Sequence, residues 1–163
     1  MTAPPLDLPV AVGTGVLAGI ARKARPKAPM EVLDRAEVTC ERGVEGDFRG
    51  LFRPGGRNRR QVTLFERGDW LAACAEVGVE APWWLRRCNL LVDGIDLPQR
   101  PGALLRVGEA WFEVTVECDP CSRMDAVAPG MFRALVPDWR GGVCTRVVSG
   151  GAIVVGDTIE VVG

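Results

Sequence analysis

The chain has 163 residues, of which 47% are hydrophobic and 25% charged, and its net charge is −1 at pH 7. These values indicate one globular domain over residues 1–163, with residues 1–11 as a loose N-terminal segment. The near-zero charge disfavours nucleic acid as a partner, and no stretch approaches the ~20 apolar residues that cross a bilayer. Histidine and tyrosine are absent, so the chemistry would use sulfur, carboxylates and arginines.

The six cysteines do not form the pattern of a disulfide framework. Residues 1–9 lack the basic start and apolar core of a secretory leader. Cys40, Cys74, Cys88 and Cys144 are scattered in apolar or mixed surroundings, which is typical of reduced thiols. We therefore expect a cytoplasmic protein with no membrane association.

The first half of the chain predicts short strands separated by loops. Residues 10–21 are apolar and contain three glycines, which suits a bent or bulged strand. After them we expect a basic loop at 22–29, a strand at 32–40 and a glycine-containing turn at 42–47. An arginine-rich loop at 49–60 and a further strand at 61–65 follow.

One helix stands out in the middle of the chain. Trp70, Leu71, Cys74 and Val77 recur at a spacing near 3.6 residues, which predicts a helix over 66–77 that stops at Gly78. Residues 131–135 predict one or two helical turns. The remaining predicted elements are short strands at 89–92, 103–107, 109–117, 143–149 and 158–162.

Many short strands and few helices predict a mostly β fold. Closing the sheet into a complete or nearly complete β-barrel would remove exposed strand edges, so we expect a barrel with a few short helices. We find no internal repeat, and nothing divides the chain into two domains.

The pair Cys118 and Cys121 is the strongest chemical signal. It stands where a predicted strand gives way to a polar loop with Ser122 and Arg123, a setting that favours thiolate at Cys121. Four interpretations remain open: half of a zinc site, a thioredoxin-like dithiol, two ordinary buried thiols, or a single functional thiolate at Cys121 beside a neighbouring Cys118.

Two further features suggest anion binding. Arg87 and Asn89 precede a predicted strand and would share one of its faces, forming a donor patch for an anionic ligand. The chain has eighteen arginines and only two lysines, and the arginine guanidinium binds phosphate or carboxylate through two parallel hydrogen bonds. A coding bias towards arginine explains the same count.

Taken in order, these motifs resemble the MOSC domain, named for the C-terminal part of molybdenum-cofactor sulfurases. The resemblance covers residues 12–163. The matching pieces are Lys23 before Pro29-Met30, then 43–47 (GVEGD), 59–64 (RRQVTL), 87–92 (RCNLLV), 94–97 (GIDL), 102–110, 119–121 (DPC), 142–143, 146–147, 150–151 and 155–159.

The resemblance implies a β-barrel that binds the molybdenum cofactor, a pterin dithiolene with a phosphate. It implies that Cys121 is the molybdenum ligand and that Lys23, Arg87 and Asn89 contact the cofactor. Many members have arginine directly after the turn that ends at Asp47, whereas this chain has Phe48; Arg49 or Arg60 would replace that contact. No cysteine-desulfurase module is present, so we expect no pyridoxal phosphate.

The main functional hypothesis is a molybdoenzyme that reduces N-hydroxylated compounds, such as hydroxylamino purines or amidoximes, with electrons from a separate reductase. Asp47, Asp119 and Asp125 are the carboxylates placed in sequence to move protons, and Ser122 and Arg123 would add cofactor contacts. The alternatives are a sulfur carrier with a persulfide on Cys121 and a non-catalytic cofactor carrier. Small stand-alone relatives are often dimeric, which makes a homodimer a further expectation.

Overall fold

The computed structural model describes residues 11–162. The expected loose segment 1–11 therefore lies outside the described residues, except for Ala11, which begins the first strand. None of the helices in the described range has the length and apolar character that a membrane span needs.

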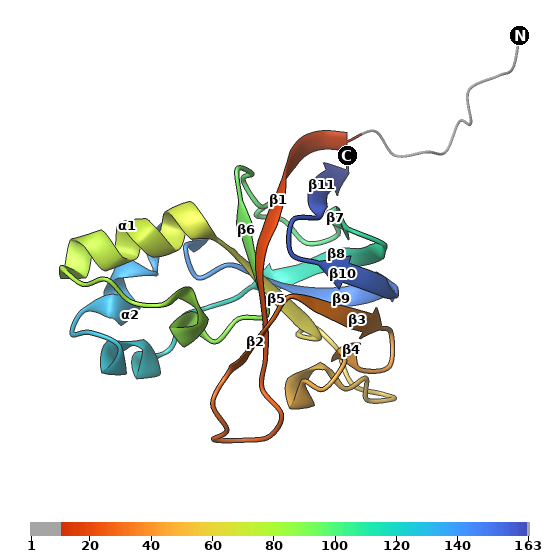
Figure 1. Cartoon of the computed structure of the whole chain (residues 1–163), viewed down its shortest axis with the longest axis horizontal. Helices are drawn as coiled ribbons and strands as arrows, with labels where there is room; N and C mark the ends of the chain where they lie inside the picture. Colours follow the sequence, from red (N-terminus) through yellow and green to blue (C-terminus); the bar gives the residue numbers. More distant parts are fainter. Residues whose placement is uncertain (1–10, 163) are drawn as a thin grey trace, which may run out of the picture.

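Seven strands close into a mixed β-barrel, which confirms the predicted fold class (Figure 1). Around the barrel the order is β1-β11-β7-β8-β9-β5-β6, and β6 returns to β1. The β5–β6 pair is parallel, and the other neighbours are antiparallel. The strand bounds are β1 Ala11–Arg22, β5 Val62–Glu66, β6 Leu90–Asp93, β7 Leu104–Val107, β8 Ala110–Glu117, β9 Val143–Ser149 and β11 Thr158–Val162.

Strand β1 is bent, as its glycines predicted, and it pairs with three other strands. Its first half pairs with β11, and its second half pairs with β6 and with the short strand β2 (Glu31–Leu33). The register shifts between Leu17 and Gly19. A Cβ at Gly19 would overlap the ring of Trp83, so this position needs glycine for a close approach of the two segments.

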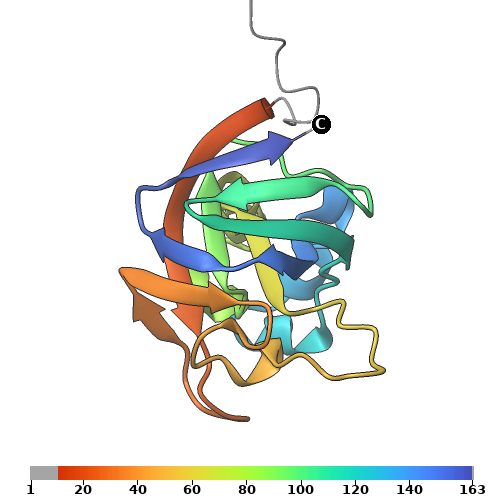
Figure 2. The same ribbon diagram turned by 90° about the vertical axis from the view of Figure 1, so that its right-hand side faces the viewer.

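A second sheet covers one side of the barrel (Figure 2). It has the order β10-β3-β4, with β3 Arg35–Thr39, β4 Gly43–Val44 and β10 Gly151–Val154. The single strand predicted over 32–40 is therefore two strands, β2 and β3, which belong to different sheets. The break at Asp34 lets the chain pass from the barrel to the second sheet.

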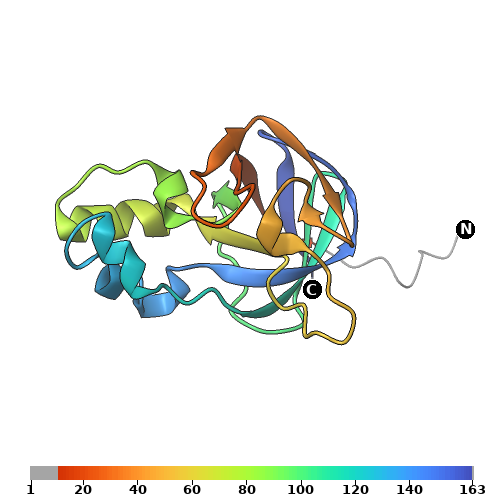
Figure 3. The same cartoon turned by 90° about the horizontal axis from the view of Figure 1, so that it is seen from below.

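Two helices lie side by side on one flank of the barrel, to the left in Figures 1 and 3. They are α1 (Arg67–Val77) and α2 (Met131–Ala134), close to their predicted bounds. Gly78 has φ +76° and ends α1 as predicted, because only glycine adopts this conformation without strain. The four 3-10 helices are η1 Phe48–Gly50, η2 Trp83–Arg86, η3 Ser122–Ala126 and η4 Pro137–Trp139.

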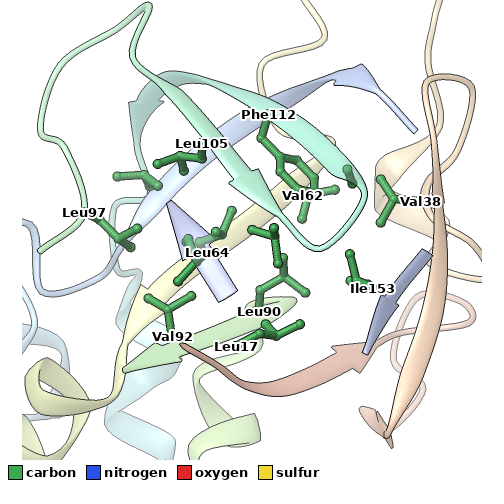
Figure 4. Packing of buried hydrophobic residues seen from close by; sticks show 14 of the residues in the cluster. Leu17, Val38, Val62, Leu64, Leu90, Val92, Leu97, Leu105, Phe112 and Ile153 are labelled. Carbon is green, nitrogen blue, oxygen red and sulfur yellow. The ribbon is translucent and has the colours of Figure 1, made fainter. Parts of the chain in front are cut away.

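The barrel interior is filled by apolar side chains from alternate positions of its strands (Figure 4). On β8, for example, Ala110, Phe112 and Val114 are buried, whereas the residues between them are partly exposed. Ile153 and Val38 of the second sheet join this core. Each fully buried large side chain contributes about 1.5–3 kcal/mol, so the barrel provides a rigid base for its loops.

Glu66, at the end of β5, should make stability depend on pH. Burial raises the pKa of its carboxyl from 4.5 to about 7, although the Leu97 N–H donates to it over 3.2 Å. Because folding favours the protonated form, stability should fall as pH rises through this range. We expect Glu66→Gln, which still accepts that bond, to raise the free energy of unfolding by about 1–2 kcal/mol near pH 8 after allowing for screening, and hardly near pH 4.

Urea unfolding at the two pH values would measure this difference. The exposed Glu76, which pairs with Arg140, provides the control, and Glu76→Gln should show no comparable pH dependence. Equal gains for Glu66→Gln at both pH values would contradict the prediction.

Candidate active site around Cys121

Four segments gather on the lower side of the molecule in Figures 1 and 2, the side that faces the viewer in Figure 3. They are the loop 23–30 after β1, the segment 47–60 with η1, the helix η2, and the turn from Cys118 into η3. These segments line two adjoining cavities. The thiol cavity, of 500 Å³, contains Cys121, and the apolar groove, of 750 Å³, lies beside it. Lys23, Lys27, Arg87, Arg123 and Met124 line both.

Cys121 sits where β8 has ended and η3 begins. The Cys118 N–H donates to the Gly142 carbonyl over 2.8 Å, which fixes the end of the strand. Cys121 then has extended backbone, with φ −118° and ψ 167°, and its carbonyl accepts the first bond of η3 from Met124 N–H at 2.9 Å. Its thiol is exposed and lines the thiol cavity.

The other thiol of the motif has a different environment. Cys118 is fully buried in the cluster beneath α1 and α2, together with Cys88 and Cys144. The Sγ atoms of Cys88 and Cys118 are 3.8 Å apart. The hydrogen bond with Cys118, together with burial, raises the pKa of Cys88 well above its usual value. Cys74, Cys88 and Cys144 are scattered in the sequence, but all three lie with Cys118 in this one buried cluster behind the site.

The thiol cavity is strongly cationic. Its lining has one carboxylate, Asp119, and seven basic side chains, which are Lys23, Lys27, Arg49, Arg60, Arg86, Arg87 and Arg123. Such a concentration of positive charge around a cavity favours an anionic ligand.

Arg86 is the functional candidate that the sequence did not reveal. It is only 4% exposed, and no carboxylate within residues 11–162 pairs with it. Its Nη2 donates to the carbonyls of Gly141 and Cys118 over 2.7 and 3.0 Å and lies 3.5 Å from the Cys118 Sγ. The guanidinium therefore fastens the cysteine turn to η2, and it presents an unpaired buried charge to the thiol cavity.

A second network of hydrogen bonds and ion pairs joins Lys23, Asp47 and Arg49. The Asp47 Oδ1 accepts the Lys23 backbone N–H at 2.8 Å and lies 3.4 Å from Arg49 Nη2. Arg49 Nη1 donates to the Arg87 carbonyl over 2.7 Å, so this network holds the cap of η2. Lys23 is 4% exposed. Burial, and then the charges of Arg87 and Arg49, lower the pKa of its ammonium group.

The structure separates Arg87 from Asn89, which corrects the prediction that they share a strand face. Arg87 precedes β6, has φ +72° as the cap of η2, and lines both cavities. Asn89 is 2% exposed: its Oδ1 accepts from Thr63 N–H at 3.1 Å, and its Nδ2 donates to Ala21 O at 3.1 Å. Its amide ties β1 to β5 rather than lining either cavity.

Some of the other predicted site residues line the thiol cavity, and others do not. Arg60, Asp119 and Arg123 line the thiol cavity. Ser122 is exposed but lines neither cavity. Asp125 accepts the Phe132 N–H at 2.9 Å and so holds α2 in place.

A signal in the composition points to part of the cavity lining that the motifs did not predict. The chain has only two lysines among twenty basic residues, and both Lys23 and Lys27 line the two cavities. The buried Arg86 and the aromatic wall formed by Trp84 have no comparable signal, because their roles depend on which segments the fold brings together.

Solved structures of other proteins share this fold. The crystal structure of the YuaD protein from Bacillus subtilis superposes with a TM-score of 0.74 at 20% identity and covers 92% of this chain and 96% of its own. YiiM from Escherichia coli has a TM-score of 0.64 at 19% identity, over 91% of this chain and 70% of its own. YiiM from Geobacillus stearothermophilus has a TM-score of 0.64 at 15% identity, and the match covers 94% of this chain and 74% of its own.

No curated protein sequence matches the chain. The model of the MOSC domain, in contrast, matches residues 53–160, about two thirds of the sequence. This range includes β5 to β10, η2, and the turn that carries Cys121. The chain therefore belongs to the MOSC domain family.

Proposed function

We propose that the protein binds the molybdenum cofactor and reduces N-hydroxylated compounds, with Cys121 as the molybdenum ligand. One observation carries the proposal: an exposed thiol opens onto a cavity lined by seven basic side chains. Family membership supports the same reading, because it implies a molybdenum cofactor.

The donor set fits this group chemically. A thiolate is a soft ligand and suits a sulfur-ligated redox metal. Cys121 provides a single thiolate, and a dithiolene brings the further sulfur ligands that such a metal needs. The cofactor's phosphate is an anion, and arginine forks such as that of Arg87 suit phosphate. Lys23 and Arg123, which also line the cavity, add positive charge.

Arg86 supports the fit independently. A buried guanidinium without a carboxylate is costly unless an anion approaches it. Its fixed position, bonded to Gly141 and Cys118, means that the Arg86 side chain itself need not reorganise when the anion enters. We therefore expect Arg86 to face the anionic part of the cofactor.

Carboxylates near the cavity would manage protons. When bound, the cofactor would supply removal of the N–OH oxygen, which leaves the amine or amidine, and a separate reductase would restore two electrons with release of water. Asp119 lines the thiol cavity, which supports a role for it in passing a proton to the departing oxygen. Asp47 is buried and bonded to Lys23 and Arg49, so its contribution is to position those two residues.

Metal and pterin analysis tests the proposal. Protein purified from a host that makes the cofactor should contain close to one molybdenum and one pterin per chain, and it should reduce benzamidoxime with an artificial electron donor. Protein with no molybdenum would contradict it. A Cys121 adduct about 32 Da heavier after incubation with a cysteine desulfurase would indicate a sulfur carrier instead. Tight cofactor binding without turnover would indicate a cofactor carrier.

A further inference from the structure

We infer that the apolar groove beside the thiol cavity is the binding site for the aromatic body of the substrate, with Trp84 as the wall on which its ring stacks. This inference rests on the proposed function, since it names the class of N-hydroxylated compound that the site selects. Neither the MOSC domain match nor the structural neighbours assign a role to Trp84.

Trp84 is exposed but rigidly held. It is 37% exposed at the start of η2, and its ring lies 5.9 Å from that of Trp83 at an angle of 82°. Trp83 in turn lies 6.2 Å from Phe65 and packs against Gly19 of β1. An exposed indole held by other rings in this way is preorganised, so it loses little conformational entropy when a ligand stacks on it.

The groove has the size and character of a small-molecule site. Its 750 Å³ volume lies within the usual range for ligand pockets, and Leu85 and Val127 extend the apolar wall that Trp84 begins. Met30 adds to this wall and is held by a contact of 3.9 Å between its sulfur and Arg49 Nη2. Exposed apolar side chains gathered around a hollow mark a binding surface.

The groove also adjoins the cavity that contains Cys121. Met124 and four cationic residues line both cavities, so a molecule whose ring lies in the groove extends its polar end towards Cys121. The cationic residues at the junction repel a positively charged body. The favoured occupant is therefore a neutral or anionic planar ring with the N-hydroxy group at one end, such as an aromatic amidoxime.

Equilibrium binding without an electron donor tests this assignment. Benzamidoxime and acetamidoxime differ by a phenyl ring in place of a methyl group, and calorimetry would measure both on cofactor-loaded and cofactor-free protein. We expect benzamidoxime to bind more tightly. Trp84→Ala should weaken benzamidoxime binding by roughly 2- to 12-fold, the equivalent of one aromatic pair, and leave acetamidoxime unchanged. Trp84→Phe should retain most of the affinity.

Trp111→Ala is the matched control. Trp111 lies on β8, and the centre of its ring is 5.6 Å from the Arg106 guanidinium carbon. It lines neither cavity, so its removal should not alter benzamidoxime affinity. Leu85→Ala gives a second variant within the groove, and circular dichroism would verify that each variant is folded.

The outcomes separate the two proposals. Unchanged benzamidoxime affinity in the Trp84→Ala and Leu85→Ala proteins would overturn the ring site. A loss of molybdenum and pterin from Trp84→Ala protein would also overturn it, since the groove would then hold the cofactor. Absence of molybdenum from the wild-type protein would contradict the proposed function, whereas the ring site would still be measurable on cofactor-free protein.

Discussion

Cys121→Ser should reduce the molybdenum content of the purified protein to background and abolish reduction of benzamidoxime. Serine keeps the size of the side chain but removes the soft sulfur that the proposed molybdenum site requires. Because Cys121 is exposed and packs in neither core cluster, the free energy of unfolding should change by less than about 0.5 kcal/mol. Metal analysis, turnover and urea unfolding would measure the three quantities on the same sample.

Two other cysteines are suitable controls for this variant. Cys40 is also exposed but does not line the thiol cavity, so Cys40→Ser should keep its molybdenum. Cys74 lies on the buried face of α1, so Cys74→Ala should lose roughly 1 kcal/mol of stability yet retain the metal. If Cys121→Ser protein keeps a full complement of molybdenum, Cys121 is not the ligand.

Arg86→Met should lower the free energy of unfolding by about 3 kcal/mol or more, the largest stability effect that we expect at the site. Methionine fills a similar volume but leaves the carbonyls of Gly141 and Cys118 without their donor, and buried unsatisfied acceptors cost about 1–3 kcal/mol each. The cysteine turn would also lose its tie to η2. Urea unfolding measures the first effect, and cofactor content measures the second.

Arg140→Met is the comparison for Arg86. Arg140 also bonds a carbonyl, that of Ala134, over 3.0 Å, and it pairs with the exposed Glu76. Its loss should cost less, about 1 kcal/mol, and should not alter cofactor content. An Arg86→Met protein as stable as wild type would mean that the buried charge costs as much as its hydrogen bonds contribute, which would contradict our account of this residue.

Local patterns in the sequence predicted most of the barrel. The strands at 143–149 and 158–162 have their predicted bounds, because both runs are rich in β-branched residues and follow clear turn residues. Strand β10 escaped prediction because Gly150 and Gly151 look like part of a turn. The division of 32–40 into two strands was also missed, since it follows from the partners of each half rather than from composition.

The candidate site was predicted less completely. The loop with Cys121 and the cationic residues Lys23 and Arg87 carry local signals, and the structure places all three around one cavity. The placement of Asn89 was wrong because the two-residue period assumes a regular strand, whereas Arg87 has a left-handed backbone that turns the chain before β6 begins. The buried charge of Arg86 is a tertiary feature, visible only once Cys118 and Gly141 lie next to it.

The pairing of β1 with β11 bears on how the protein is made. The barrel closes between the first and the last strands of the described chain. Ala11 pairs with Val162 at one end of this contact, and Val16 pairs with Thr158 at the other. During translation, β1 and β7 therefore keep open hydrogen-bonding edges until Thr158–Val162 have left the ribosome. Each edge stays unpaired from the synthesis of its own strand until β11 emerges, so chaperone binding would protect the nascent chain most in that interval.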